Sequence, residues 1–266
     1  MPTASIALLL DTKYVTGWER QAIENLLNSN RVDVTISHII VNDSQNDKGM
    51  ADNLRSFVFD FSLWKGYIAA KMVRDLAIGS PWYQESFNLH DVIHLGKVEE
   101  MYCTPQPVNG LGNELSTDAI SFLEEVDVAI RFGFGILKGE ALTAPKHGVV
   151  SYHHGDVREY RGRPAGFYEF LHNEEYAGVT VQRLNQELDK GDIAAFTQVP
   201  IGDVSSYKEV RNRLFASSGN LLEIAVENCV KEENIHPPET TGELYTTPSA
   251  QTMVCFIKRH FGEKLN

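Results

Sequence analysis

The chain is poor in cysteine and contains no long hydrophobic stretch. Its 266 residues include three cysteines, Cys103, Cys229 and Cys255, which lie far apart and form no Cys-x-x-Cys pair. This spacing argues against a disulfide framework and is typical of reduced thiols. No stretch approaches the roughly 18 apolar residues that a membrane-spanning helix needs, and the first residues carry neither a basic leader nor a cleavage site. We therefore expect a cytoplasmic protein without a membrane partner.

Positive charge is also scarce. The chain has 24 basic and 36 acidic side chains, which give a formal net charge of −12. Proteins that bind nucleic acid need a basic surface to neutralise phosphates, and the only dense basic stretch is Arg158, Arg161 and Arg163. Three arginines can hold one small anionic ligand but not a long polyanion. The composition thus excludes nucleic acid as a partner, while nothing in it excludes a homo-oligomer.

Alternating apolar segments predict an α/β fold. The run Ile6–Leu10 is typical of a buried strand, a helical repeat begins at Trp18, and residues 32–41 are rich in β-branched side chains. A strand, a helix and a second strand in this order indicate a parallel sheet. We predict a Rossmann-like, open, mostly parallel sheet flanked by helices over residues 1–204. Residues 205–266 are predicted to form a C-terminal helical extension that packs on it.

The later segments extend this pattern. A helix is expected over residues 57–78, and its buried side is predicted to contain Trp64, Ile68, Met72 and Val73. Further strands are predicted at residues 91–95, 126–130, 149–152, 178–184 and 193–201. The sequence Ser206-x-x-Glu209 is a capping box, which predicts the beginning of the C-terminal helices.

The usual nucleotide and metal motifs are absent. There is no Gly-x-x-x-x-Gly-Lys-[Ser/Thr] sequence, and Phe132–Ile136 has too few glycines for dinucleotide binding. That segment does follow a predicted strand, where open α/β sheets bind ligands. His90 and His94 are four residues apart on a predicted strand, so they would lie about 13 Å from each other and could not share one ion. We therefore predict no metal site.

The residues best suited to catalysis are His153, His154 and Asp189. The two histidines follow a predicted strand, and because side chains alternate along a strand, at most one of them is expected to be catalytic. An imidazole titrates near neutral pH and can transfer a proton or stabilise developing negative charge. Asp189 could orient such an imidazole, but its sequence Leu-Asp-Lys-Gly-Asp is also typical of a turn. Spacing alone leaves both interpretations open.

Taken in order, these residues resemble the folate-dependent formyltransferases. The family includes methionyl-tRNA formyltransferase, glycinamide ribonucleotide transformylase and the sugar-nucleotide N-formyltransferases. Its central pattern is Asn-x-His, an Arg-Gly pair eight residues after the histidine, Gly-Val-Thr, and Leu-Asp-x-Gly-Asp. This chain contains, in the same order, His153, Arg161-Gly162, Gly178-Val179-Thr180 and Leu188-Asp189-Lys190-Gly191-Asp192. The resemblance covers about residues 126–201.

The resemblance implies 10-formyltetrahydrofolate as co-substrate and matches His153 and Asp189 to the family's catalytic pair. Ser151 stands where the family has its catalytic asparagine, whose amide can donate to a developing oxyanion. Loss of one such donor typically costs about 10²–10³ in rate, so Ser151 either replaces the asparagine or alters the activity. The residues implied to bind the folate are Phe134, Gly135, Ile136, Leu137 and Asp192.

A second departure follows the histidine, where the family has Ser-Leu-Leu-Pro and this chain has Gly-Asp-Val-Arg. Asp156 and Arg158 thus place charges beside the expected mouth of the site. With His154 they are assigned to the acceptor, although a solvated charged loop is the alternative interpretation. The resemblance implies an N-formyltransferase acting on a small amine, with an amino-sugar nucleotide as the first expectation. A 10-formyltetrahydrofolate hydrolase and a non-catalytic homologue that binds folate or a nucleotide sugar stay open.

Overall fold

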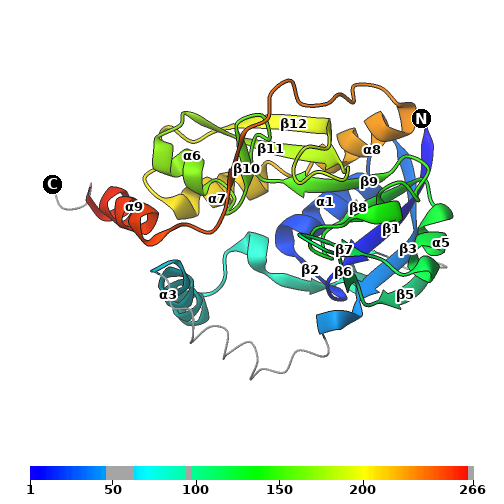
Figure 1. Cartoon of the computed structure of the whole chain (residues 1–266), viewed down its shortest axis with the longest axis horizontal. Coiled ribbons are helices and arrows are strands. Elements are labelled where there is room, and N and C mark those ends of the chain that lie inside the picture. The colour runs from blue at the N-terminus through cyan, green and yellow to red at the C-terminus, as the bar shows by residue number, and fades with distance from the viewer. Residues whose placement is uncertain (46–62, 94–97, 263–266) are drawn as a thin grey trace.

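A seven-stranded sheet forms the centre of the computed structural model, which describes residues 1–45, 63–93 and 98–262. Its strands lie in the order β12-β11-β9-β8-β1-β3-β5 (Figure 1). They are β1 (Thr3–Leu10), β3 (Asp33–Asn42), β5 (Glu99–Cys103), β8 (Val128–Arg131), β9 (Val149–His153), β11 (Tyr176–Arg183) and β12 (Asp192–Pro200). All neighbours pair in parallel except β11, which runs antiparallel to both β9 and β12. The predicted mostly parallel sheet is therefore confirmed.

Helices α1 (Gly17–Leu27) and α8 (Leu221–Lys231) cover one face of this sheet, and α5 (Thr117–Glu124) covers the other (Figure 1). The other described α-helices are α3 (Leu63–Ile78), α4 (Leu89–Val92), α6 (Phe167–His172), α7 (Tyr207–Ala216) and α9 (Ala250–Gly262), of which α3 and α9 lie beyond one end of the sheet in Figure 1. In β1, Ile6 and Leu8 belong to the same core as α1 and α8, whereas Ala7 and Leu9 belong to the core beneath α5. A strand covered on both faces is an unbroken apolar run, as in Ile6–Leu10. Among the described residues, no helix has the length and apolarity to cross a bilayer.

Three short strand pairs complete the described fold. They are β2 (Tyr14–Thr16) with β4 (Ser86–Asn88), β6 (Gln106–Pro107) with β7 (Asn113–Glu114), and β10 (Tyr160–Gly162) with β13 (Glu243–Tyr245). The last pair ties the C-terminal segment to the loop that follows β9. Gly162 has φ 87° there, and a Cβ atom on it would lie 1.9 Å from the carbonyl oxygen of Tyr245. This close backbone contact therefore requires glycine.

The C-terminal helices α7 and α8 share the main core. Leu222 and Val226 of α8 are fully buried in the cluster that also contains the buried face of α1. Ser206 caps α7, as the sequence predicts, because its hydroxyl accepts the backbone N–H of Glu209. The Glu209 carboxylate itself accepts from Arg213. The division of the chain at residue 204 stays a prediction.

The strand predicted at residues 91–95 is wrong where the structure describes it. Residues Leu89–Val92 form the helical turn α4, because the side chain of Asn88 accepts the backbone N–H of His90 and caps the turn. Residues 94–97, which include His94, lie outside the described residues. The argument that kept His90 and His94 apart on a strand therefore fails.

The predicted buried side of the helix over residues 57–78 is also wrong in part. The described helix, α3, begins at Leu63, and residues 57–62 lie outside the described residues. Met72 and Val73 are 61% and 66% exposed. Trp64, in contrast, meets Phe167 edge to face and packs against the core. The helix thus contacts the core near its beginning, through Trp64 and Tyr67, rather than along its length.

Replacing Gly162 with alanine should destabilise the protein more than the same change at Gly79. The two glycines have nearly the same φ, 87° and 89°, but no atom lies within 4 Å of a Cβ built on Gly79. Gly79→Ala should cost about 1–3 kcal/mol of unfolding free energy, the usual cost of a left-handed non-glycine residue. Gly162→Ala must in addition separate β10 from β13. Urea denaturation of the two variants measures the difference, and equal losses would contradict the backbone contact.

Candidate active site

The carboxyl ends of β8 and β9 bring the predicted site together. The two strands are parallel neighbours, so their last residues, Arg131 and His153, lie at the same edge of the sheet. β11 runs the other way and places Thr180 opposite His153. Its first residues therefore also lie at this edge. In open α/β sheets this is the edge at which ligands bind.

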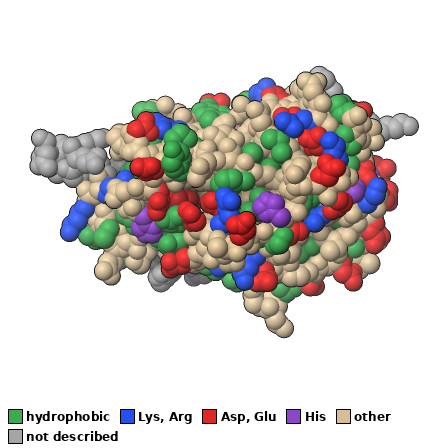
Figure 2. All heavy atoms as spheres, turned by 90° about the horizontal axis from the view of Figure 1, so that it is seen from above, with side chains coloured by type: hydrophobic (Ala, Val, Ile, Leu, Met, Phe, Trp, Pro, Cys, Tyr) green, Lys and Arg blue, Asp and Glu red, His purple; other side chains and the backbone are tan. Residues whose placement is uncertain are grey.

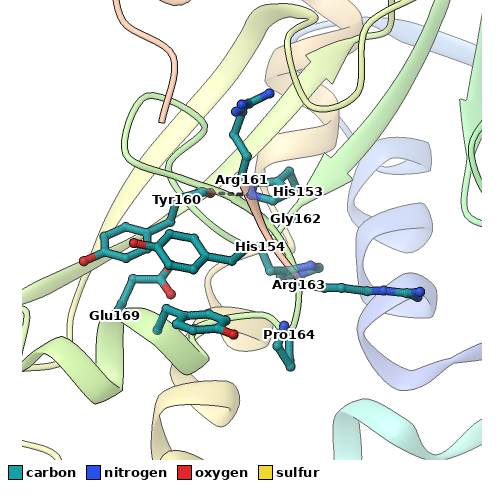
Figure 3. Close-up of a pocket in the computed structure, with 11 residues that line it drawn as sticks. His153, His154, Tyr160, Arg161, Gly162, Arg163, Pro164 and Glu169 are labelled. Atoms are coloured by element: carbon teal, nitrogen blue, oxygen red, sulfur yellow. Dashed lines mark hydrogen bonds between the residues drawn. The ribbon is translucent and has the colours of Figure 1, made fainter. Parts of the chain in front are cut away.

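His153 is held by a backbone carbonyl group. Its Nε2 lies 2.8 Å from the carbonyl oxygen of Tyr160, the contact dashed in Figure 3. A carbonyl oxygen only accepts, so Nε2 carries the proton of this bond. The other ring nitrogen, Nδ1, lies 3.8 Å from Oδ1 of Asp189, and the His153 side chain is 8% exposed. The imidazole is therefore fixed with Nδ1 toward the aspartate.

Asp189 is positioned by the Arg-Gly pair of the predicted motif. The backbone N–H of Gly162 donates to Asp189 Oδ2 over 2.9 Å. Arg161 donates through Nη1 to the carbonyl oxygen of Leu188 over 3.2 Å and through Nε to that of Gly242 over 2.7 Å. The Arg161 guanidinium thus holds the turn that carries the aspartate. Asp189 itself has φ 49°, the left-handed conformation expected of an Asp-x-Gly turn.

The Gly-Val-Thr sequence of β11 supports the loop after His153. A Cβ atom on Gly178 would lie 2.7 Å from the backbone nitrogen of Asp156, so only glycine allows this approach. The hydroxyl of Thr180 donates to the carbonyl oxygen of Gly155 over 2.8 Å. A Cβ atom on Gly155 would in turn lie 2.7 Å from His153 Nε2. The elements of the sequence motif therefore meet in space around the histidine ring.

The separation of His153 Nδ1 and Asp189 leaves both groups available to a ligand. Their 3.8 Å distance is longer than a hydrogen bond of about 2.7–3.2 Å. A reacting atom placed beside them could contact both. The arrangement suits the removal of a proton by the carboxylate and the stabilisation of negative charge by the imidazole.

Ser151 is buried and fully engaged with Arg131. Its hydroxyl donates to the Arg131 carbonyl oxygen over 3.0 Å and accepts from Arg131 Nη2 over 2.9 Å. The single hydroxyl hydrogen is thus already used. Ser151 occupies the position matched to the family's catalytic asparagine, but its hydroxyl has no hydrogen left to donate to a ligand. The hydrogen-bond donor beside this position is the guanidinium of Arg131.

Arg131 is the residue of this site that the sequence analysis missed. Its Nη1 donates to the carbonyl oxygen of Gly135, and its Nε is buried with no hydrogen-bond partner among the described residues. Burial lowers the pKa of the guanidinium, and the carboxylates of Asp189 and Asp11 oppose that shift. The sequence signal that could have revealed Arg131 is a charged residue at the end of an otherwise apolar strand, Val128–Arg131.

The predicted folate loop lies directly after β8, but two of its side chains point inward. Phe134 and Leu137 are 1% and 3% exposed and belong to the core beneath α5. Gly135 is exposed and Ile136 is half-buried. The backbone N–H of Phe134 donates to Asp11 Oδ1 over 2.8 Å. The loop therefore offers a ligand its backbone, Gly135 and Ile136 rather than the two buried side chains.

The predicted acceptor residues are engaged within the protein. Arg158 donates through Nε and Nη2 to both carboxylate oxygens of Asp156, over 2.8 and 2.7 Å, and its guanidinium lies 4.3 Å from the centre of the Phe196 ring. Nε2 of His154 lies 2.9 Å from the hydroxyl of Ser218, and its ring packs against Trp18. Burial lowers the pKa of His154 to about 3, so its ring is neutral.

Asp192, assigned to the folate, has a partner in the structure. Its Oδ2 accepts from Arg183 Nη2 over 3.1 Å. The structure therefore places His153, Asp189 and Ser151 together with Arg131 and the folate loop. The roles of the individual residues stay predictions. Among the described residues, no group of three or more histidine, cysteine, aspartate or glutamate side chains is arranged to hold a metal ion.

Comparison with known proteins gives a match to one family. Residues 111–226 match the family described as formyl transferase. The methionyl-tRNA formyltransferase of Halalkalibacterium halodurans is 28% identical over 144 residues, which are 54% of this chain and 42% of that protein. The enzyme of the same name from Thermotoga neapolitana is 33% identical over 120 residues, 44% of this chain and 37% of that protein. The match thus spans less than half the length of these curated relatives.

Solved structures share the fold at low identity. Glycinamide ribonucleotide transformylase 1 from Symbiobacterium toebii has a TM-score of 0.53 and 17% identity, and the match covers 89% of this chain and 95% of that one. A sugar N-formyltransferase from Shewanella has a TM-score of 0.54 and 12% identity, covering 96% and 87%. The predicted resemblance is confirmed: residues 111–226 of this chain match the formyl transferase family, and solved formyltransferases share its fold.

Proposed function

We propose that this chain is an N-formyltransferase that moves the formyl group of 10-formyltetrahydrofolate to the amine of a small acceptor. The observation that carries the proposal is the pairing of His153 Nδ1 with Asp189 at 3.8 Å, at the carboxyl edge of a formyltransferase fold. The folate fits the names of solved neighbours, since an N-formyltransferase from Helicobacter canadensis is described in complex with folinic acid. Action in the cytoplasm, independence of nucleic acid and any homo-oligomer stay predictions.

The proposed reaction begins with attack of an unprotonated amine on the formyl carbon. Asp189 accepts the proton that the amine loses, directly or through a water molecule. In its imidazolium form, which carries a proton on both ring nitrogens, His153 donates from Nε2 to the Tyr160 carbonyl group and from Nδ1 to the oxygen that becomes negative. The carbon–nitrogen bond to the folate then breaks, and the proton passes to the departing folate nitrogen. Each step uses a group that the structure holds in a fixed orientation.

We infer that Arg131 takes the part of the family's asparagine. The Ser151 hydroxyl donates its hydrogen to a backbone carbonyl group, whereas the arginine beside it carries a positive charge and a buried Nε without a partner among the described residues. A buried cation can stabilise an oxyanion strongly because water does not screen it. Ser151 then acts by orienting the guanidinium through Nη2.

The amino-sugar nucleotide expected from the sequence receives mixed support. The Helicobacter canadensis enzyme is described with dTDP-3-aminofucose as well as folinic acid. The phosphates of such an acceptor would need a small anionic site, for which the sequence offers Arg158, Arg161 and Arg163. The first is paired with Asp156, the second with two backbone carbonyl groups, and only Arg163 is exposed.

Hydrolysis of 10-formyltetrahydrofolate is the second candidate function. A formyltetrahydrofolate deformylase from Pseudomonas syringae shares the fold, with a TM-score of 0.53 and 14% identity. A hydrolase would release formate in the absence of any amine. A non-catalytic homologue would bind folinic acid and form no product with any amine. A formate assay with and without a panel of primary amines separates the three.

Asp189→Asn should lower turnover by about 10²–10⁴, because an amide cannot accept the proton of the amine. The assay follows the loss of 10-formyltetrahydrofolate with the most active amine of the panel. Binding of folinic acid, measured by fluorescence, should change little. Asp118→Asn, an exposed aspartate of α5, is the control and should keep full turnover. Normal turnover in Asp189→Asn would refute the assigned role.

Arg131→Met should lower kcat by about 10²–10³, as for loss of an oxyanion donor, with little change in the KM for the folate. Ser151→Ala should have a smaller effect, because the serine orients the guanidinium without donating to the oxyanion. Arg131→Lys, which keeps the charge, should recover part of the rate. The same steady-state assay measures all three variants, and a wild-type kcat in Arg131→Met would contradict the inference.

A further inference from the structure

Two neighbouring cavities lie on this side of the sheet, and the first of them is lined by His153. It is a narrow space of about 10 Å³, close to the size of one water molecule, and its lining includes Tyr160, Tyr168, Glu169 and Tyr245 as well as Arg161 and Arg163 (Figure 3). The second has a volume of about 390 Å³ and extends along the first residues of β11. Both are lined by Tyr160 and Glu169. These two residues therefore join the catalytic histidine to a space that can hold a small molecule.

Glu169 is a buried carboxyl group with an unused oxygen. The residue is 3% exposed, and its Oε1 is buried with no hydrogen-bond partner among the described residues. In Figure 3 its side chain rises from α6 toward Tyr160. Its pKa is raised to about 8, chiefly by burial and in smaller part by the carboxylates of Glu174 and Asp156. Buried polar atoms normally have partners, so this oxygen is suited to a donor that a ligand supplies.

The position of Glu169 is fixed by its neighbours on a short helix. Phe167 and Phe170 of α6 are 0% and 3% exposed and belong to the main core. The helix follows Gly166, where a Cβ atom would lie 2.6 Å from a side-chain carbon of Leu214. Both phenylalanines and this close approach hold α6 in place, and the Glu169 carboxyl group is therefore kept beside the two cavities.

Three tyrosine rings surround the narrow space. Tyr160 stacks on Tyr245 with ring centres 5.4 Å apart, and Tyr245 stacks on Tyr168 at 4.2 Å. The faces of aromatic rings attract cations. The rings and the Glu169 carboxyl group together form a site for an amino group that takes the carboxyl proton and stays bound as ammonium, a group about the size of a water molecule.

The larger cavity is acidic. Its lining includes Asp156, Glu159, Glu169, Glu174 and Glu175, and among the described residues it contains no lysine or arginine. Asp156 is paired with Arg158, but Glu159 and Glu175 are exposed. In Figure 2, acidic side chains gather over the region of α6. Such a wall attracts cations and repels the phosphates of a nucleotide.

We propose that these cavities bind an acceptor that carries a second positive charge: a small diamine without phosphate. One amino group, protonated, lies against Glu169 and the tyrosine rings. The other, unprotonated, reaches the formyl group beside His153 and Asp189. The reaction of the unprotonated amino group rests on the proposed function. Binding of the charged amino group does not, because it requires no formyl transfer.

Calorimetric titration of the full chain, without folate, tests the charged site. The probes are putrescine, n-butylamine as its singly charged analogue, and uridine diphosphate. Wild type should bind putrescine about tenfold or more tightly than n-butylamine, because one buried charge-assisted contact has about this effect. Uridine diphosphate should not displace putrescine. Glu169→Gln should abolish the preference. Equal binding of the two amines by wild type would overturn the proposal, as would displacement of putrescine by the diphosphate.

Two further variants keep the result interpretable. Glu233→Gln, an exposed glutamate at the end of α8, should keep the preference for putrescine. Glu175→Gln changes the wall of the larger cavity without touching the core and should weaken putrescine by about two- to fivefold. It tests the site even if Glu169→Gln fails to fold, and an unchanged affinity of Glu175→Gln for putrescine would count against the acidic cavity.

The failure of the charged site can be distinguished from the failure of the proposed function. Putrescine binding without formyl transfer would refute the proposed function alone. Transfer to n-butylamine and putrescine with equal kcat/KM would refute the charged site alone.

Discussion

The position of His153 and Asp189, the proposed catalytic groups, depends on how the chain returns after β9. Residues 154–160 turn back so that the carbonyl oxygen of Tyr160 meets His153 Nε2, and two residues later the N–H of Gly162 meets Asp189. Both contacts come from backbone groups. Apart from Gly155, where a Cβ atom would lie 2.7 Å from His153 Nε2, the side chains of the loop can therefore vary without moving His153 and Asp189. The length of the loop cannot vary in this way. This explains why the number of residues between His153 and the Arg-Gly pair is a better sequence signal for this site than either the histidine or the Arg-Gly pair alone.

The sheet could be predicted because its central strands are buried on both faces. Ile6–Leu10 and Val128–Arg131 show this as short apolar runs. The edge strand Glu99–Cys103 gives no such signal, since Cys103 is its one buried residue. The strand expected at residues 91–95 failed for a local reason: the Asn88 side chain caps a helical turn, and a capping bond can decide between helix and strand in so short an apolar segment.

The site could be predicted only where its residues belong to the sequence motif. Arg131 lies twenty residues before its partner Ser151, and their contact follows from the pairing of β8 with β9 rather than from any local pattern. Glu169 lies between two buried phenylalanines, and a single acidic residue in a short helix suggests an exposed position. Its burial follows from packing against α7, which begins forty residues later. Buried charges set by distant contacts are thus the features that a single sequence conceals.

The two buried ionisable groups, Arg131 and Glu169, have opposite effects on an amine, and this difference would give a diamine acceptor a direction. An amine must lose its proton to attack, and a nearby guanidinium such as Arg131 lowers the pKa of an amine beside it. The carboxyl group of Glu169, with Glu174 and Asp156 close by, raises the pKa of an amine that it binds. A diamine that spans the two positions would therefore be neutral at the formyl group and charged at the tyrosine rings. The same two amino groups in the reverse orientation would present ammonium to the cation and the neutral amine to the carboxylates, which costs free energy at both ends.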